Sequence, residues 1–371
     1  MLAGTLVLGM AGLTALAQNP VTQASAPPLP GMPPVLDPND IYAADHAGML
    51  ADHVKKYPAL VYVPNSKSDT VDVIDQKTFK IVGHFPSGGK EPQHVVPSWD
   101  MKTLWVINDL GDTATPIDPS TGKRGTTIKV LDPYNMYYTP DGKFAIVVEE
   151  RLKALAFLDP KTMKVVDTVH VDCPGIDHMD FTTNGRYLIA SCEFSGQVVK
   201  VDVAEHKVLG YLRFAKDKES MPQDVKTSPD GKVFYVADMM ANGIHLVDPN
   251  TFQKIGFIET GKGCHGLYVS RDSKVLYISN RGEGSVTVLD LATRKIQTKW
   301  QIPGGGSPDM GGVSADGKQL WLAGRYDGEI YVFDTGNGKL IQRIKVGKGP
   351  HGLCVYPQPG RYSLGHTGVF R

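Results

Sequence analysis

Four histidines recur in one sequence context in this chain of 371 residues, which contains 11 histidines in all. Each stands at the start of a short apolar run: His94, His178, His265 and His351. Imidazoles from several segments, directed at one point, can hold a transition-metal ion, and neighbouring Met and Cys residues favour copper. The alternative is that these are ordinary loop histidines whose nitrogens are satisfied by water or by the backbone.

Carboxylates form a second candidate group, and they outnumber the cations found in the same kind of loop. The acidic candidates are Glu149, Glu193, Asp224, Asp238 and Asp309, and the accompanying cations are Arg281 and Arg325. A cluster of carboxylates near a channel of low dielectric attracts a cation, either calcium or a cationic ligand. The alternative is a solvated rim, which explains most scattered loop charges.

The spacing of the four cysteines favours a disulfide over a haem-attachment or zinc site. Cys173 precedes one predicted strand and Cys192 ends the next, so their side chains are expected on the same face of the same unit, where a disulfide forms in an oxidising compartment. The sequence has no Cys-x-x-Cys pair, which argues against covalent haem and a zinc knuckle. It also lacks a phosphate-binding glycine loop in a strand-to-helix setting and a Gly-x-Ser-x-Gly nucleophile motif.

A repeated unit must position these residues, and Pro222–Asn250 shows it clearly. An alternating run turns sharply at Ser228-Pro229-Asp230-Gly231, where Pro presets φ and Gly accepts a positive φ. Two further short runs follow, rich in Val, Phe and Tyr, and the last ends at Asp248. Runs this short with this composition predict strands, and the unit is a small antiparallel sheet that needs neighbours.

The unit recurs along most of the chain. Its first strand begins at His94, Asn135, His178, Asp224, Gly266, Met310 and Gly352, at spacings of 41, 43, 46, 42, 44 and 42 residues. The aspartate that closes its third strand also occurs seven times, where it is expected to accept backbone N–H groups in a turn. A period in the forties with several strands per repeat predicts an all-β, seven-bladed β-propeller.

The two ends of the repeat region predict how the ring closes. The first three-strand group, beginning at Leu60, lacks a first strand, and the last first strand, Gly352–Tyr356, has no group after it. Together they complete one blade, which removes the open sheet edges. In such a ring the loops before each first strand and after each second strand converge on one face. The candidate histidines, carboxylates and arginines would therefore gather at the channel mouth.

The repeats also resemble a known family. Tyr62-Val63-Pro64-Asn65 and Tyr277-Ile278-Ser279-Asn280 are similar to the strand-end motif of the YVTN (YncE-like) β-propeller repeats, as are Pro350-His351-Gly352 and Ser228–Lys232. The resemblance covers about residues 59–357. It implies a propeller fold and an exported or periplasmic protein. It says little about activity, because the family includes binding proteins and related propellers carry hydrolytic, lyase or redox sites.

The regions outside the repeats predict export. Residues 1–17 are apolar without a charge and end in small residues, as a signal peptide does, and 16 apolar residues are short for a membrane span. Residues 18–58 are predicted to form a proline-rich linker with a short helix over 39–57, and residues 358–371 a C-terminal tail. The sequence thus predicts a periplasmic or secreted chain with no transmembrane segment after processing.

Two classes of function remain open at this point. The first is a propeller that binds a small molecule or a protein partner at the channel mouth without catalysis. The second is an enzyme, either a copper-dependent oxidoreductase that uses the four histidines or a lactonase or lyase that uses a divalent cation held by carboxylates. The formal net charge is zero, so the chain has no bulk basic field for nucleic acid.

Overall fold

The computed structural model describes residue 1 and residues 27–215, 219–366 and 369–371. Most of the predicted signal peptide therefore lies outside the described residues. No helix in these described ranges is long and apolar enough to cross a membrane.

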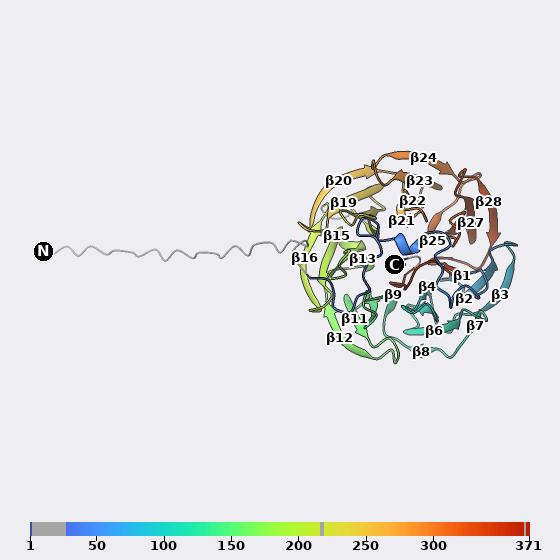
Figure 1. Cartoon of the computed structure of the whole chain (residues 1–371), viewed down its shortest axis with the longest axis horizontal. Coiled ribbons are helices and arrows are strands. Elements are labelled where there is room, and N and C mark those ends of the chain that lie inside the picture. The colour runs from blue at the N-terminus through green and yellow to red at the C-terminus, as the bar shows by residue number, and fades with distance from the viewer. Residues whose placement is uncertain (2–26, 216–218, 367–368) are drawn as a thin grey trace.

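Seven antiparallel sheets surround a central axis, which confirms the predicted seven-bladed propeller (Figure 1). The first blade joins β29 (Cys354–Tyr356) to β1 (Leu60–Asn65), β2 (Thr70–Asp75) and β3 (Ile81–Pro86). Because β29 pairs with β1 near the other end of the chain, the predicted ring closure is also confirmed.

The other six blades follow in chain order. The second has β4 (Pro92–Pro97), β5 (Leu104–Asn108), β6 (Thr113–Asp118) and two short strands that pair with β6, β7 (Lys123–Arg124) and β8 (Ile128–Lys129). The third has β9 (Pro133–Tyr138), β10 (Ala145–Glu149), β11 (Ala154–Leu158) and β12 (Val165–His170). The fourth has β13 (Ile176–Phe181), β14 (Tyr187–Cys192), the 3-10 turn η3 (Glu193–Ser195), β15 (Gln197–Asp202) and β16 (Lys207–Arg213).

The remaining three blades repeat the same pattern. The fifth has β17 (Pro222–Thr227), β18 (Phe234–Asp238), β19 (Gly243–Asp248) and β20 (Gln253–Glu259). The sixth has β21 (Cys264–Val269), β22 (Val275–Asn280), β23 (Ser285–Asp290) and β24 (Ile296–Gln301). The seventh has β25 (Pro308–Val313), β26 (Gln319–Gly324), β27 (Glu329–Asp334) and β28 (Leu340–Lys345).

Local side-chain hydrogen bonds explain the turns that the sequence repeats. Ser228 Oγ donates to Asp230 Oδ1 at 2.7 Å and accepts the N–H of Val233, while Gly231 has φ +66°. The closing Asp248 accepts the N–H groups of Asn250 and Thr251 through Oδ1. Such bonds replace the ladder bonds that a strand loses where it ends. The turn chemistry thus sets strand length in each blade.

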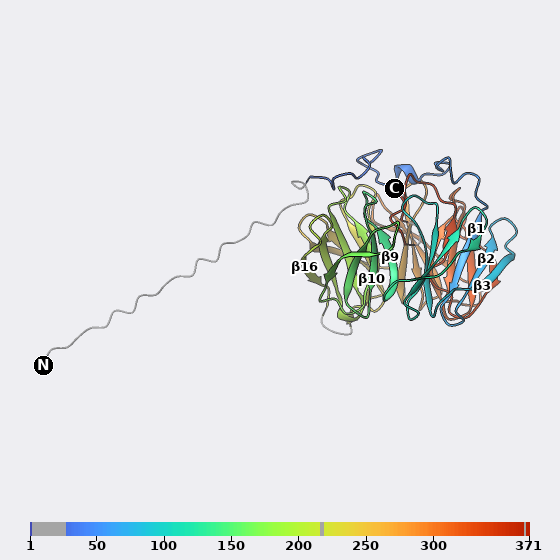
Figure 2. The ribbon, with the colours of Figure 1, turned by 90° about the horizontal axis from the view of Figure 1, so that it is seen from below.

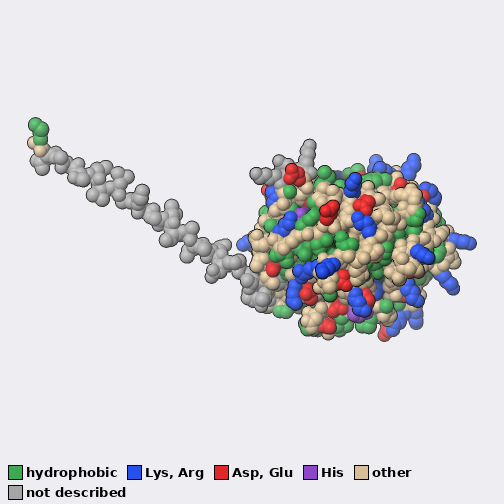
Figure 3. Space-filling model, turned by 90° about the horizontal axis from the view of Figure 1, so that it is seen from above, with side chains coloured by type: hydrophobic (Ala, Val, Ile, Leu, Met, Phe, Trp, Pro, Cys, Tyr) green, Lys and Arg blue, Asp and Glu red, His purple; other side chains and the backbone are tan. Residues whose placement is uncertain are grey.

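The hydrophobic core lies between the blades. The three inner strands of the fifth blade are almost entirely buried, whereas β20 alternates between exposed and half-buried residues. On the outside of the ring, basic and acidic side chains are interspersed (Figure 3). The chain thus shows no single-sign field on this side, in keeping with its zero net charge.

Residues 27–58 and the C-terminal end of the chain lie on one face of the ring, where they form a cap over the channel (Figure 2). We use "cap" for residues 27–58 together with the tail, residues 357–371. Ile41 N–H donates to Pro229 O at 2.9 Å, and Tyr42 Oη donates to Thr227 O at 2.7 Å, so the cap sits over the turns that follow the first strands.

The helix expected over 39–57 is reduced to one 3-10 turn, η2 (Ala43–Asp45). The backbone there bonds instead to the propeller and to local turns, and the carboxylate of Asp40 accepts the N–H of Tyr42. Burying Tyr42 and Val54 across the face of the ring requires an irregular path rather than a continuous helix.

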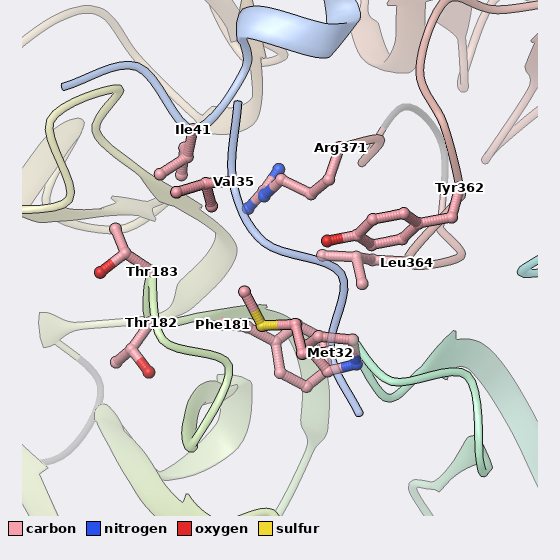
Figure 4. Close-up of a pocket in the computed structure, with 10 residues that line it drawn as sticks. Met32, Val35, Ile41, Phe181, Thr182, Thr183, Tyr362, Leu364 and Arg371 are labelled. Carbon is pink, nitrogen blue, oxygen red and sulfur yellow. The ribbon is translucent and has the colours of Figure 1, made fainter. Parts of the chain in front are cut away.

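The C-terminal tail is a buried part of the fold. Ser363 N–H donates to Trp99 O at 3.0 Å, and the N–H of Tyr138 donates to Leu364 O at 2.9 Å. The guanidinium of Arg371 pairs with the buried Asp180 at 2.9 Å and stacks on Tyr42. A pocket between the two parts of the cap is lined by Met32, Ile41 and Val35 from one and by Tyr362, Leu364 and Arg371 from the other (Figure 4).

Cys173 and Cys192 form a disulfide in the fourth blade, with their Cα atoms 5.0 Å apart. Cys192 ends β14, and Cys173 lies just before β13, so the bridge ties a loop to its own sheet. Cys264 and Cys354 are buried thiols.

Candidate functional site: a histidine-lined channel

The first strand of each blade lines the central channel and places its opening residues near the axis. The pairing register aligns Pro92, Ile176 and Cys264, each opposite the last residue of the second strand. His94 and His178 lie two positions after this point, whereas His265 lies one position after it. A residue in a strand advances by about 3.3 Å, so the two kinds of histidine occupy two depths in the channel.

An irregularity in the same strands allows the histidine side chains at both depths to face the channel. The register shifts between Pro92 and His94, between Ile176 and Met179 and between Cys264 and Leu267. A bulge of this kind interrupts the strict alternation of side chains between two faces. Consecutive residues of one strand can therefore both point toward the axis.

The deeper histidines form the inner cluster, defined here as His94, His178 and His366. Each residue offers one nitrogen, and these three atoms lie within 4.8 Å of one another. The ring centroids are 5.4 Å apart for His94 and His178 and 4.6 Å apart for His178 and His366. All three side chains are buried. The third member comes from the cap, which inserts into the channel from its covered end.

Hydrogen bonds orient the inner cluster. His94 Nδ1 donates to the carbonyl oxygen of Tyr134 at 3.0 Å, so its Nε2 keeps a lone pair, and that atom has no hydrogen-bond partner among the described residues. Asn135 accepts the N–H of Met136 at Oδ1, and its Nδ2 lies 3.1 Å from His178 Nδ1 and 3.0 Å from His366 Nδ1. One amide thus holds two imidazoles in place.

Burial keeps these imidazoles neutral. Desolvation lowers the pKa of His94 to about 3 and lowers the pKa of His178 and of His366 well below the ordinary value. Removal from water penalises the charged imidazolium, and neighbouring imidazoles add to that effect. Neutral imidazole is the form that binds a metal ion.

The histidines nearer the uncapped end form the outer cluster, defined here as His265, Asp309 and His351. His265 Nδ1 lies 3.2 Å from Asp309 Oδ1, and His351 Nε2 lies 3.4 Å from Asp309 Oδ2. Two guanidinium groups approach the same carboxylate: Arg281 Nη1 at 3.0 Å and Arg325 Nε at 3.8 Å. The carboxylate of Asp309 is therefore the centre of a buried network of charges.

The two clusters adjoin one another. The ring centroids of His94 and His351 are 4.9 Å apart, and those of His178 and His265 are 6.5 Å apart. Burial also lowers the pKa of His265 and of His351 well below the ordinary value. The four histidines selected from the sequence thus lie together, with His366 as a fifth.

The carboxyl groups selected from the sequence behave differently from one another. Burial raises the pKa of Glu149 to about 7 and of Asp224 to about 6, and it also raises the pKa of Glu193. Asp224 accepts backbone N–H groups from Val225 and Leu267. The negative charge at this end of the channel is therefore smaller than a count of acidic residues suggests.

Asp238 takes part in a separate network in the fifth blade. Its carboxylate accepts a hydrogen bond from Ser220 Oγ at 2.5 Å and the N–H of Met221 at 2.9 Å, and it lies 3.0 Å from His245 Nε2. These partners satisfy the carboxylate within its own blade. Neither Asp238 nor Glu149 belongs to a potential metal-ligand group found among the described residues.

Sequence reasoning missed His366 and the role of Asn135. Asn135 occupies the same aligned position as His94 and His178, so the repeat register could have identified it. His366 lies outside the repeats, and no periodic signal marks it. Its position depends on the folded cap.

The fold and the site together define the class of this protein: it is a seven-bladed propeller whose channel contains a group of buried histidines. The chain belongs to the YNCE-like β-propeller family, whose sequence model matches residues 31–360. No curated protein matches the chain.

Three solved structures illustrate the similarity of fold. Hydrazine synthase from Kuenenia stuttgartiensis is 17% identical, with a TM-score of 0.60 over 71% of this chain and 88% of that one. A functionally unknown protein from Desulfotomaculum acetoxidans is 16% identical, with a TM-score of 0.65 over 79% and 98%. The dihydro-heme d1 dehydrogenase NirN is 16% identical, with a TM-score of 0.61 over 90% and 78%. At these identities the likeness concerns the fold alone.

Proposed function

We propose that this chain is a metal-binding propeller that holds one transition-metal ion on the inner cluster. The observation that carries the proposal is the meeting of three buried, neutral imidazoles whose donor atoms lie within 4.8 Å of one another. Nitrogen donors bound to an ion at about 2.0–2.1 Å lie within roughly this distance of one another. The unpartnered Nε2 of His94 supports it, because buried polar atoms normally have partners.

The donor set favours copper among the available ions. Imidazole nitrogens suit copper and zinc, and copper(II) binds most tightly in the divalent series, whereas calcium takes oxygen ligands. Three protein ligands also leave a coordination position open, which suits a site that acts on or binds a small molecule. We therefore place copper first and zinc second.

Asn135 would assist the change from the metal-free to the loaded state. In the described geometry its Nδ2 lies beside Nδ1 of His178 and Nδ1 of His366, at 3.1 and 3.0 Å. Turning the amide over would present Oδ1 to the same point. Asn135 is thus a positioning residue whose replacement by Leu would weaken metal binding, because two of the three imidazoles would lose the amide that orients them.

Export belongs to the same proposal. The disulfide between Cys173 and Cys192 is typical of proteins that fold in an oxidising compartment, in keeping with the apolar run at residues 1–17. Copper would be loaded in the periplasm or outside the cell, and a small-molecule or protein partner would approach at the uncapped end. A propeller that binds such a partner without any metal is the second candidate.

Metal analysis of purified protein tests the proposal. Metal-free protein is dialysed against copper(II) and, separately, zinc(II), and the bound ion per chain is measured. We expect one copper ion, with electron paramagnetic resonance showing coupling to imidazole nitrogens. His178→Ala and His366→Ala should abolish stoichiometric binding, whereas His53→Ala, at an exposed histidine in the cap, should not. No stoichiometric uptake by the wild-type chain would refute the metal site and leave the second candidate.

A further inference from the structure

We propose that the uncapped end of the channel is a binding site for a small oxyanion or carboxylate, held by Arg325 beside the outer cluster. The inference deepens the proposed function, because it names the chemical class of ligand that would reach the metal site. It stands on the geometry of the outer cluster, which is present with or without a metal.

The guanidinium groups of Arg281 and Arg325 differ in how many hydrogen-bond partners they have. Arg281 donates to Asp309 at 3.0 Å and contacts the sulfur of Met239 at 2.7 Å, and its guanidinium stacks on the ring of Tyr326. Arg325 comes no closer than 3.8 Å to Asp309 in its ion pair, which is too long for a hydrogen bond. Its Nη1 atom is buried and has no hydrogen-bond partner in the ranges that the structure describes. This guanidinium therefore has donor capacity left for a ligand.

His351 provides a second unsatisfied group in the same place. Its side chain is only 2% exposed, and its Nδ1 atom has no hydrogen-bond partner among the described residues. Leaving buried donors unpaired costs free energy, which a bound ligand recovers. An anion with two or more oxygens can accept from Arg325, and an O–H group of the same ligand can donate to Nδ1 of His351, since the ring proton faces Asp309 from Nε2. Planar carboxylates and phosphates suit a guanidinium particularly well.

The charges at this end favour an anion over a cation. Two guanidinium groups face one fully buried carboxylate, that of Asp309. The other acidic groups nearby contribute less, because burial raises the pKa of Glu150 to about 8 and also raises the pKa of Glu193. A second metal ion at the outer cluster would have to compete with Arg281 for Asp309.

A pocket leads to Arg325 from outside. It is lined by Lys67, Lys348, Arg325 and Tyr326, together with Asp327 and adjoining glycines. The carboxylate of Asp327 accepts hydrogen bonds from Ser307 Oγ and Tyr331 Oη, so it is engaged within its own blade. The two lysines are exposed. Positive charge on the wall of an entrance raises the local concentration of anions.

The test uses metal-free, full-length protein, so that it does not depend on the metal site. Isothermal titration calorimetry measures binding of inorganic phosphate and, in a second arm, of acetate. Arg325→Gln should weaken the preferred anion at least about tenfold, a loss expected for a charged hydrogen bond. Arg325→Lys should retain part of the affinity. Arg213→Gln, at an exposed arginine on the outer strand β16, should bind like the wild type.

The outcomes separate this inference from the proposed function. Binding of phosphate or acetate that depends on Arg325 supports the anion site even when copper uptake fails. The comparison of the two arms distinguishes a tetrahedral oxyanion from a carboxylate. Equal affinity in the wild type and in a folded Arg325→Gln variant overturns the inference. Uptake of a second metal ion that requires Asp309 and His351 also overturns it, because the outer cluster would then be a cation site.

Discussion

The imidazole ring of His366 lies 5.4 Å from that of His94, centroid to centroid, although one belongs to the C-terminal tail and the other to the first strand of the second blade. The tail reaches this position because it is bonded along its length to the covered end of the ring. The proposed metal site is therefore complete only when the tail is docked on the closed propeller.

Replacing His366 tests that relationship directly. His366→Gln removes one imidazole while the tail contacts of Ser363 and Arg371 remain. We expect copper affinity to fall by about 100-fold or more, because a ligand is lost from a three-ligand site. The thermal transition of the metal-free protein should change little. Competition with a chromophoric chelator measures the affinity, and an unchanged value would exclude His366 as a ligand.

The channel histidines should make a measurable contribution to the pH dependence of the stability of the metal-free protein. Unfolded imidazoles titrate near pH 6.5, whereas burial lowers the pKa of His94 to about 3 and that of the other channel histidines well below normal. Between these values each of these imidazoles binds more protons in the unfolded chain, so its contribution to the free energy of unfolding falls as the pH falls, whereas buried carboxyl groups with raised pKa values contribute in the opposite direction. Each such histidine contributes up to about 1.4 kcal/mol per pH unit.

Urea unfolding at pH 7.0 and 5.5 measures this dependence. Each buried, neutral histidine should contribute a loss of about 1 kcal/mol between the two, which buried carboxyl groups with raised pKa values, such as Glu149 and Glu150, offset in the wild type. His178→Asn should show a smaller loss, because one titrating group has been removed. Bound copper should oppose the loss, since it favours the folded, deprotonated imidazoles. A change in the free energy of unfolding between the two pH values that is the same in the wild type and in His178→Asn would contradict the burial of a neutral His178.

The repeat made the fold and much of the site predictable. Turn residues such as Pro229 and Gly231 determine where strands end, and a period in the forties places every first strand on the axis. His94, His178, His265 and His351 therefore met as expected. Two of them, His265 and His351, precede glycine, whereas His94 and His178 come one position later, and the structure places the two pairs at different depths in the channel.

The features of the site that could not be predicted depend on long-range contacts and on burial. His366 could not be placed, because the ion pair between Arg371 and Asp180 that helps anchor the tail joins residues far apart in the chain. Asp238 was proposed as a ligand but bonds to Ser220 within its blade. The acidic excess expected at the mouth is weakened by raised pKa values, as at Glu149, which depend on burial that a sequence does not display.

Asp309 should be important for folding as well as for the channel. Asp309→Asn would leave Arg281, a buried cation, without its 3.0 Å partner. Removing one member of a buried ion pair costs about 3–5 kcal/mol, so we expect a loss of that order in the free energy of unfolding. Chemical denaturation measures it. Asp52→Asn, at the fully exposed pair with Lys55, is the matched control and should cause no measurable change.

Reducing the disulfide should destabilise the fourth blade. Cys173 and Cys192 are separated by 19 positions, and closing a loop of this size stabilises a fold by about 3 kcal/mol in the chain-entropy model. Replacing both cysteines by serine should lower the urea midpoint accordingly. Cys264→Ser is the control, because that thiol is unpaired and the disulfide remains in the variant. Reductant should lower the urea midpoint of this variant as much as that of the wild type.

The closing strand should matter more to the ring than the tail does. A chain that stops after Lys348 lacks β29, leaving β1 as an open edge and the first blade incomplete. A chain that stops after Pro359 keeps β29 but lacks His366 and the rest of the tail. We expect the first to lose its cooperative thermal transition and the second to keep one at a lower temperature, without copper binding. Cooperative melting of both chains at the same temperature would show that β29 does not close the ring.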